Sequence, residues 1–117
     1  MKKTIITTAT LLCAFFVTAN SALAWKSLAY TPVGQWAWDY GHLYEEDARK
    51  AAILKCAYSF GPCNPGVSIQ EHWTGVLANC NGVLITAGSE YGASGALVVA
   101  AKKVGMPRGS CLALTYF

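Results

Sequence analysis

Apolar and polar residues alternate with different periods along the chain, and the order of these patterns occurs twice. Residues with strand-like alternation or apolar runs lie near 25–30, 36–40 and 66–72, and a helical pattern lies between the last two, near 45–57. The same order follows, with strands predicted near 74–80, 83–87 and 110–116 and a helix near 94–104. Each half is therefore predicted to contain strand, strand, helix and strand.

The ends of the two predicted helices carry residues that favour helix termini. Glu45, Glu46 and Asp47 fill the first turn of the first helix, where carboxylates meet the positive end of the helix dipole. The second helix is followed by Gly105, which suits a position just past a helix, and by Pro107, which cannot continue one. These signals support both helices independently of the apolar pattern.

The two halves align with each other when the chain is shifted by 48 residues. The shift places Gly34 on Gly82, Ala48 on Ala96, Ala52 on Ala100, Lys55 on Lys103 and Cys63 on Cys111. The matches occur in one order, so we interpret about 25–73 and 74–117 as two repeats of a β-β-α-β unit. We therefore predict a single α+β domain over 25–117, with one largely antiparallel sheet, both helices on one face and pseudo-twofold symmetry.

The residues before the first predicted strand have the features of a secretory signal peptide. Met1-Lys2-Lys3 is a short basic segment, residues 4–19 are apolar and almost uncharged, and Ala22-Leu23-Ala24 supplies the small residues that signal peptidase requires. We expect residues 1–24 to be removed, which makes Trp25 the first residue of the exported protein. The leader is typical of bacteria and predicts a location in the periplasm or outside the cell.

The exported part is nearly neutral. The whole chain has a formal net charge of +3, and Lys2 and Lys3 supply two of these charges, which leaves +1 over residues 25–117. This balance does not favour binding to nucleic acid or to an anionic membrane surface. Beyond the leader, no apolar run is long enough to predict stable insertion into a membrane.

Four cysteines remain once Cys13 leaves with the signal peptide. In an oxidising compartment they predict two disulfides, for which three connectivities are possible. We favour Cys56–Cys63, because the glycines and prolines around this short loop bring its ends together, and Cys80–Cys111 as the second bridge. A zinc site is the alternative, but the Cys-x6-Cys spacing and two scattered histidines do not form a recognised ligand set.

Several aromatic and alanine-containing segments resemble one bacterial family. They are Trp25-x2-Leu28-Ala29-Tyr30, Trp36-Ala37-Trp38-Asp39-Tyr40, the alanine-rich helix that includes Cys56, and Gly75-Val76-Leu77-Ala78. Over nearly the whole exported part, the chain resembles the domain-of-unknown-function family 4189, whose members are small exported proteins. It departs from that pattern at Tyr44, where a small polar residue is usual, and at Val104, where a cysteine is frequent. The resemblance implies a fold and an exported location but no activity.

Groups suited to catalysis are few in the exported part. His42 follows Tyr40 and precedes the acidic first turn of the first helix, and His72 follows Glu71 at the end of a strand. Adjacent residues on a strand point to opposite faces, so Glu71 and His72 are not expected to pair. We predict that the protein is not an enzyme and that it needs no metal or cofactor. The alternative is a small cell-envelope hydrolase that uses His42 or His72 with a nearby carboxylate.

Three aromatic residues occupy alternate positions of the second predicted strand. Trp36, Trp38 and Tyr40 therefore share one face of it. The repeat places Ala37 beneath the first helix and matches Trp38 with Thr86, whose polarity suits a solvated face. Two arrangements follow: the rings line an open face of the sheet and bind a partner, or they form the core. A shift of one residue in register separates the two.

These observations predict a small exported binding protein of the bacterial periplasm or cell exterior. Its roles would be those of an inhibitor, an immunity factor or an adhesin-like module, and its partner another protein or a cell-envelope glycan. The candidate contact residues are Trp36, Trp38 and Tyr40.

Overall fold

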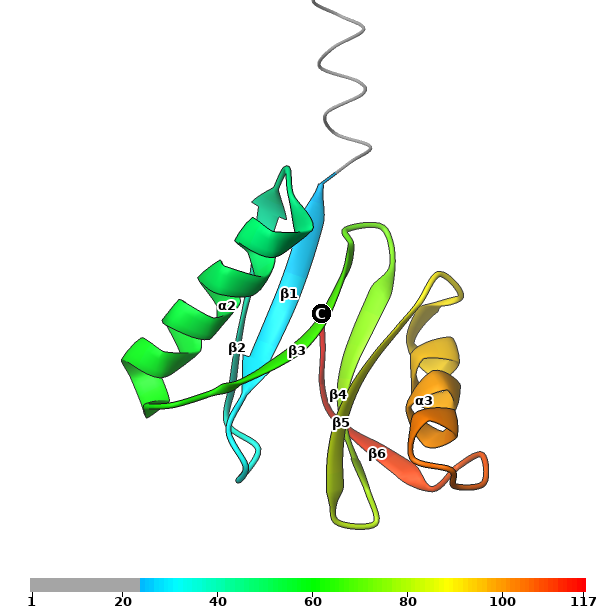
Figure 1. Cartoon of the computed structure of the whole chain (residues 1–117). Helices are drawn as coiled ribbons and strands as arrows, with labels where there is room; N and C mark the ends of the chain where they lie inside the picture. Colours follow the sequence, from blue (N-terminus) through cyan, green and yellow to red (C-terminus); the bar gives the residue numbers. More distant parts are fainter. Residues whose placement is uncertain (1–23) are drawn as a thin grey trace, which may run out of the picture.

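The computed structural model describes residues 24–117, which form two three-stranded antiparallel sheets with one helix against each (Figure 1). The first half contains β1 (Trp25–Tyr30), β2 (Trp36–His42), α2 (Glu45–Phe60) and β3 (Asn64–Gln70). The second half contains β4 (Thr74–Cys80), β5 (Val83–Ser89), α3 (Gly92–Lys103) and β6 (Cys111–Tyr116). The predicted signal peptide, apart from Ala24, lies outside the described residues.

The two sheets have the same order of strands relative to the chain. The first sheet is ordered β2-β1-β3 and the second β5-β4-β6, so the first strand of each half is central. All neighbouring strands are antiparallel. The predicted α+β class, the antiparallel pairing and the strand, strand, helix, strand order of each half are therefore confirmed.

The prediction of one sheet with both helices on the same face is wrong. Helix α2 packs on the β1, β2 and β3 sheet, and α3 packs on the β4, β5 and β6 sheet. Figure 1 shows the two helices on the outer sides and the sheets between them. The physical reason is visible in β4, where Val76 and Ala78 face α3 while Leu77, between them, is also fully buried. A strand that is apolar on both faces needs a cover on both.

Small residues bring each helix close to its sheet. The fully or almost fully buried positions of the two helices are Ala48, Ala52, Cys56, Ala96, Ala100 and Ala101. Alanine side chains project little, so the helix backbone approaches the strands closely. The helix predicted near 45–57 is confirmed, and it extends to Phe60.

Both favoured disulfides are present. Cys56–Cys63 connects α2 to the segment just before β3, across a separation of 7 residues. Cys80–Cys111 connects directly opposite residues of β4 and β6, whose Cα atoms are 4.0 Å apart. This short distance is typical of an antiparallel pair that exchanges no backbone hydrogen bonds. The second bridge therefore joins the last residue of the central strand β4 to the first residue of the edge strand β6.

An apolar layer fills the space between the sheets. Its buried members are Leu28, Ile69, Leu77 and Phe117, and partly buried Tyr30, Trp38, Val67 and Trp73 pack against them. The layer draws on both halves of the chain, so the halves are joined by a shared core as well as by the covalent chain. Each helix also has its own core beneath it.

Glycines allow β3 and β5 to approach each other across this layer. A Cβ atom on Gly88 would lie 2.6 Å from Cγ2 of Ile69, and one on Gly66 would lie 2.9 Å from Cγ2 of Thr86. The Val67 N–H donates a hydrogen bond of 2.8 Å to the Thr86 hydroxyl oxygen. The sheets are therefore in direct contact along β3 and β5, while β2 and β6 lie at the opposite edges.

Candidate functional site

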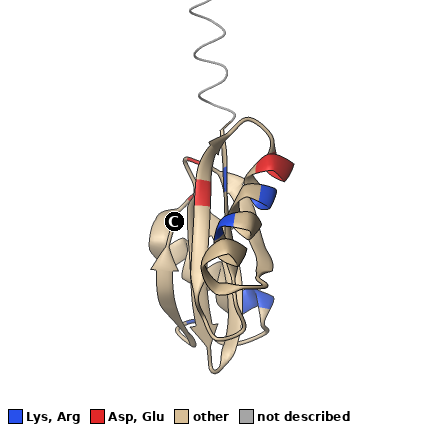
Figure 2. Cartoon of the chain, turned by 90° about the vertical axis from the view of Figure 1, so that its left-hand side faces the viewer, with Lys and Arg blue, Asp and Glu red and all other residues tan. Residues whose placement is uncertain are grey.

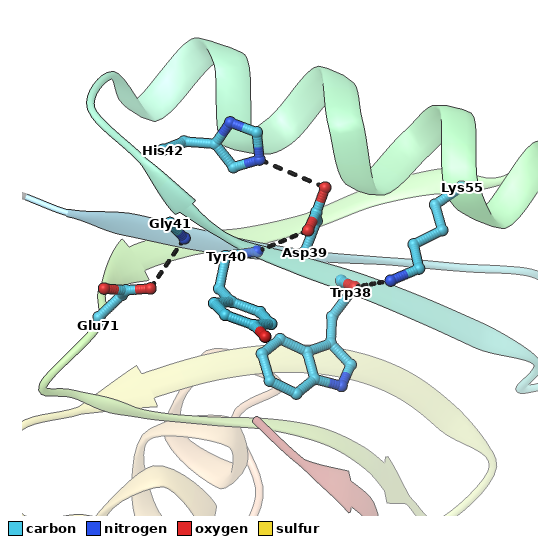
Figure 3. A network of polar contacts seen from close by, with 7 residues as sticks. All are labelled: Trp38, Asp39, Tyr40, Gly41, His42, Lys55 and Glu71. Atoms are coloured by element: carbon cyan, nitrogen blue, oxygen red, sulfur yellow. Dashed lines mark hydrogen bonds and ion pairs between the residues drawn. The ribbon is translucent and has the colours of Figure 1, made fainter.

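The three rings of β2 lie on the face that points away from α2. Ala37, between two of them, packs beneath α2 with the small core residues Ala29 and Ala52. Figure 3 shows Trp38 and Tyr40 pointing from β2 toward the second sheet. The register inferred from the repeat, which placed Ala37 under the helix, is therefore confirmed.

The three rings differ in exposure. Tyr40 is 61% exposed and Trp36 is 37% exposed, whereas Trp38 is partly buried. The Trp38 ring packs on Tyr40, with centroids 5.3 Å apart, and on Phe117, with centroids 6.3 Å apart. The row of rings therefore begins in the apolar layer between the sheets and ends in solvent. Neither of the two arrangements considered from the sequence describes all three residues.

The expectation that Thr86 faces solvent is wrong. Its side chain lies between the sheets, only 6% exposed, and its hydroxyl oxygen accepts the hydrogen bond from Val67. A hydroxyl can be buried at little cost when it has such a partner. The polarity of Thr86 therefore satisfies a backbone N–H of β3 and carries no information about an open face.

Exposed apolar residues of β6 lie on the same side of the molecule as the rings of β2. Cys111 and Ala113 face α3, so Leu112 between them faces the other way, and it is 75% exposed. Leu114 is 44% exposed and approaches the turn before β2, where a Cβ atom on Gly34 would lie 3.3 Å from Leu114 Cδ1.

We define the β2–β6 surface as Trp36, Tyr40, Leu112 and Leu114. It contains no charged residue. Figure 2 shows acidic residues at the first turn of α2 and basic residues further along the same helix. These charges lie on the opposite side of the first sheet from the β2–β6 surface.

A second apolar pair lies on α2. Tyr58 is 96% exposed and Leu54, one turn earlier, is 70% exposed. The sequence analysis did not identify this pair, although the spacing of four residues on a helix was its available signal. It lies among the charged residues of α2 and is isolated from the β2–β6 surface.

His42 pairs with a carboxylate that the sequence analysis did not identify. Its Nε2 atom lies 3.3 Å from Asp39 Oδ2, whereas the sequence pointed only to a nearby carboxylate without naming it. Residues three apart on a regular strand face opposite sides, but the pairing with β1 shifts register here and Gly41 has a φ of +79°. In the sequence, Gly41 between Asp39 and His42 was the feature that could have predicted a bulge here.

The Asp39 carboxylate is held in its ionised form. Partial burial alone would raise the pKa of Asp39, but the hydrogen bond from the Tyr40 N–H, the contact with His42 and the charge of Lys55 together lower it. The Tyr40 N–H lies 2.9 Å from Asp39 Oδ1. Figure 3 shows this network beside Glu71, whose Oε1 accepts a hydrogen bond of 2.8 Å from the Gly41 N–H.

These contacts also occupy the free edge of β2. Lys55 reaches from α2 and donates a hydrogen bond of 3.2 Å to the Trp38 carbonyl oxygen, and Asp39 accepts the Tyr40 N–H. Side chains therefore satisfy backbone groups that an added strand would need. A partner is therefore not expected to add a strand to the edge of β2. The accessible feature of β2 is the face that carries the aromatic rings.

The His42–Asp39 pair could move a proton, and in the described residues no hydrogen-bonded nucleophile accompanies it. The two side chains are 27% and 33% exposed, and no serine, threonine or cysteine of residues 24–117 is hydrogen-bonded to His42. His72 instead packs edge-on against Trp73, with ring centroids 6.5 Å apart. Within the same range, no group of three or more His, Cys, Asp or Glu is arranged to hold a metal ion.

Removing the charge of Asp39 is expected to have a pH-dependent effect on stability. Its folded pKa lies below the ordinary value of 3.8, so the ionised carboxylate stabilises the fold above that value, and this contribution is lost as pH falls through the folded pKa. Asp39→Asn keeps an acceptor for the Tyr40 N–H. Urea unfolding from neutral pH to about pH 2 should show a deficit for this variant that disappears in acid. An equal deficit at every pH would mean that the charge contributes nothing.

Comparison with family models, with curated proteins and with solved structures finds no match to this chain. The resemblance to family 4189 therefore remains a hypothesis. Among residues 24–117, no helix has both the length and the apolar character needed to cross a membrane.

Proposed function

We propose that this is an exported binding protein that contacts another protein through the β2–β6 surface. The observation that carries the proposal is the exposure of Trp36 and Tyr40 on a strand face without charge, on the same side as exposed Leu112 and Leu114. Contiguous exposed apolar residues on a small domain are typical of interaction sites, and aromatic residues are enriched where binding energy concentrates.

The partly buried members of the apolar layer support this surface from below. Trp38 is held between Tyr40 and Phe117, and Phe117 is anchored to β4 by two backbone hydrogen bonds with Gly75, of 2.7 and 2.9 Å. The Tyr40 ring therefore packs on Trp38, which is itself held in place by Phe117. A preorganised ring loses less conformational entropy on binding than a mobile one.

The cross-links support an exported location. Two disulfides in a small domain are consistent with the periplasm or the cell exterior, because cytosolic thiols are kept reduced. Removal of residues 1–24, release from the cell and a role as inhibitor, immunity factor or adhesin-like module are parts of the proposal. A hydrolase remains the alternative, and it rests on the His42–Asp39 pair alone.

Site-specific photocrosslinking tests the proposed surface. A photoreactive phenylalanine analogue at position 40 should crosslink to one partner protein in envelope extract, and the same analogue at position 58, on α2, should not. Adding Trp36→Ala should abolish the crosslink from position 40, and a circular dichroism spectrum should show that the variant, which loses a ring that is 37% exposed, remains folded.

The matched control is Tyr58→Ala, which removes a ring that is 96% exposed on α2. It should leave the crosslink from position 40 intact. Crosslinking from position 58 in place of position 40, or a crosslink that Trp36→Ala does not weaken, would contradict the proposed surface. Hydrolysis of an envelope substrate that is lost in His42→Ala would favour the alternative instead.

A further inference from the structure

A separate hollow lies where β1 begins and β3 ends. It has a volume of about 220 Å³ and is lined by Trp25, Ser68, Ile69, Gln70 and Trp73. None of these residues belongs to the β2–β6 surface. The lining combines two indole rings with one hydroxyl and one carboxamide, and it contains no charged side chain.

Strand pairing and a tight turn position the groups around the hollow. Trp25 of β1 lies directly opposite Gln70 of β3 in the sheet register. The Trp73 N–H donates a hydrogen bond of 3.0 Å to the Gln70 carbonyl oxygen, which closes the turn that follows β3. Both indoles are partly buried, and His72 packs edge-on against the ring of Trp73. The site is therefore built on strand ends and a closed turn.

Two polar side chains, Ser68 and Gln70, are among the residues that line the hollow. The Ser68 hydroxyl donates a hydrogen bond of 2.9 Å to Ser27 Oγ, and Ser27 donates to the Val67 carbonyl oxygen at 3.4 Å. The lone pairs of Ser68 Oγ therefore remain available as acceptors. Within residues 24–117, the Gln70 carboxamide makes no hydrogen bond, so both its donors and its acceptor are available.

We propose that this hollow binds one neutral pyranose ring of a glycan. Indole faces pack on the apolar C–H face of a sugar ring, and an amide with a hydroxyl acceptor can bind its hydroxyl groups. The uncharged lining disfavours an anionic or cationic ligand, because either would be desolvated without a partner. The inference goes beyond the proposed function and does not rest on it, since it concerns different residues.

Nuclear magnetic resonance of the protein purified from the periplasm tests the inference. The probes are the neutral oligosaccharides chitotriose, cellotriose and maltotriose, each added to about 10 mM, which covers the millimolar affinity expected of a single-ring site. At least one probe should shift the indole N–H signals of Trp25 and Trp73 and the side-chain amide signals of Gln70. The indole signals of Trp36 and Trp38 should stay in place.

Two variants make the result specific. Gln70→Ala and Trp73→Phe should each weaken binding of that probe by roughly tenfold or more, because each removes a directed contact at the centre of the site. Trp36→Ala serves as the control and should bind the probe with unchanged affinity. The dispersion of the backbone amide signals shows in each case that the variant is folded. Gln70→Ala leaves both indole rings of the hollow in place, so it tests the polar contact alone.

Three results would overturn the inference. The first is the absence of shifts at Trp25 and Trp73 with all three oligosaccharides. The second is binding that survives in both folded variants. The third is a shift centred on Trp36, which would assign the sugar to the β2–β6 surface. Loss of the protein crosslink described above would leave the sugar titration unaffected, so the two proposals fail independently.

Discussion

Replacing Cys80 and Cys111 together with alanine is expected to lower the free energy of unfolding by roughly 3.7 kcal/mol, whereas the Cys56 and Cys63 double variant should lose roughly 2.5 kcal/mol. The difference follows from the separation of the paired residues, which is 31 in the first case and 7 in the second. The bridge that closes the longer loop restricts the unfolded chain more strongly. Either loss is a large share of the stability expected for a small domain.

Urea unfolding of both double variants under oxidising conditions measures the two losses. Cys80 and Cys111 also line the core beneath α3, so alanine at these positions removes some packing in addition. Comparing each double variant with the wild type when both are in reductant isolates the packing contribution, because both bridges are then open and only the wild type keeps all its sulfur atoms. A larger loss from the Cys56 and Cys63 variant would contradict the explanation by loop length.

Local signals were sufficient to locate most elements. The acidic residues at positions 45–47 predicted the start of α2. The third strand was placed too late in the chain, near 66–72, because Asn64, Pro65 and Gly66 have the composition of a turn. Pro65 is tolerated because β3 is an edge strand, and Gly66 is needed where β3 approaches β5.

The arrangement of the sheets depended on contacts that local patterns do not encode. The repeat correctly placed Ala37 beneath α2, but it could not reveal that the opposite face is covered by the other half of the chain. Thr86 was misleading because its hydroxyl group is satisfied by a backbone N–H from β3. Consecutive apolar residues in β4, around Leu77, were the evidence in the sequence that both faces of this strand are buried.

The candidate sites were predictable to different degrees. The shared face of Trp36, Trp38 and Tyr40 followed from strand alternation alone. Their graded exposure did not, because it depends on Phe117, which is far away in the sequence. The hollow at Trp25 and Trp73 likewise combines residues from distant strands, and no spacing in the sequence relates them.

The packing of the two sheets against each other makes Leu77→Ala the most informative single change in the core. Leu77 is fully buried in the apolar layer between the sheets. Truncation of a buried leucine costs about 2–5 kcal/mol, because it loses the transfer free energy of the side chain and leaves a cavity. We therefore expect a large decrease in the free energy of unfolding, measured in urea.

Leu112→Ala is the matched control, since it makes the same chemical change on β6 at a side chain that is 75% exposed. It should alter the free energy of unfolding by about half a kcal/mol or less, yet weaken the partner crosslink from position 40, because Leu112 belongs to the β2–β6 surface. Equal stability losses in the two variants would mean that Leu77 is not enclosed between the sheets. An unchanged crosslink in Leu112→Ala would restrict the contact surface to β2, because binding would then depend on the aromatic rings and not on the apolar residues of β6.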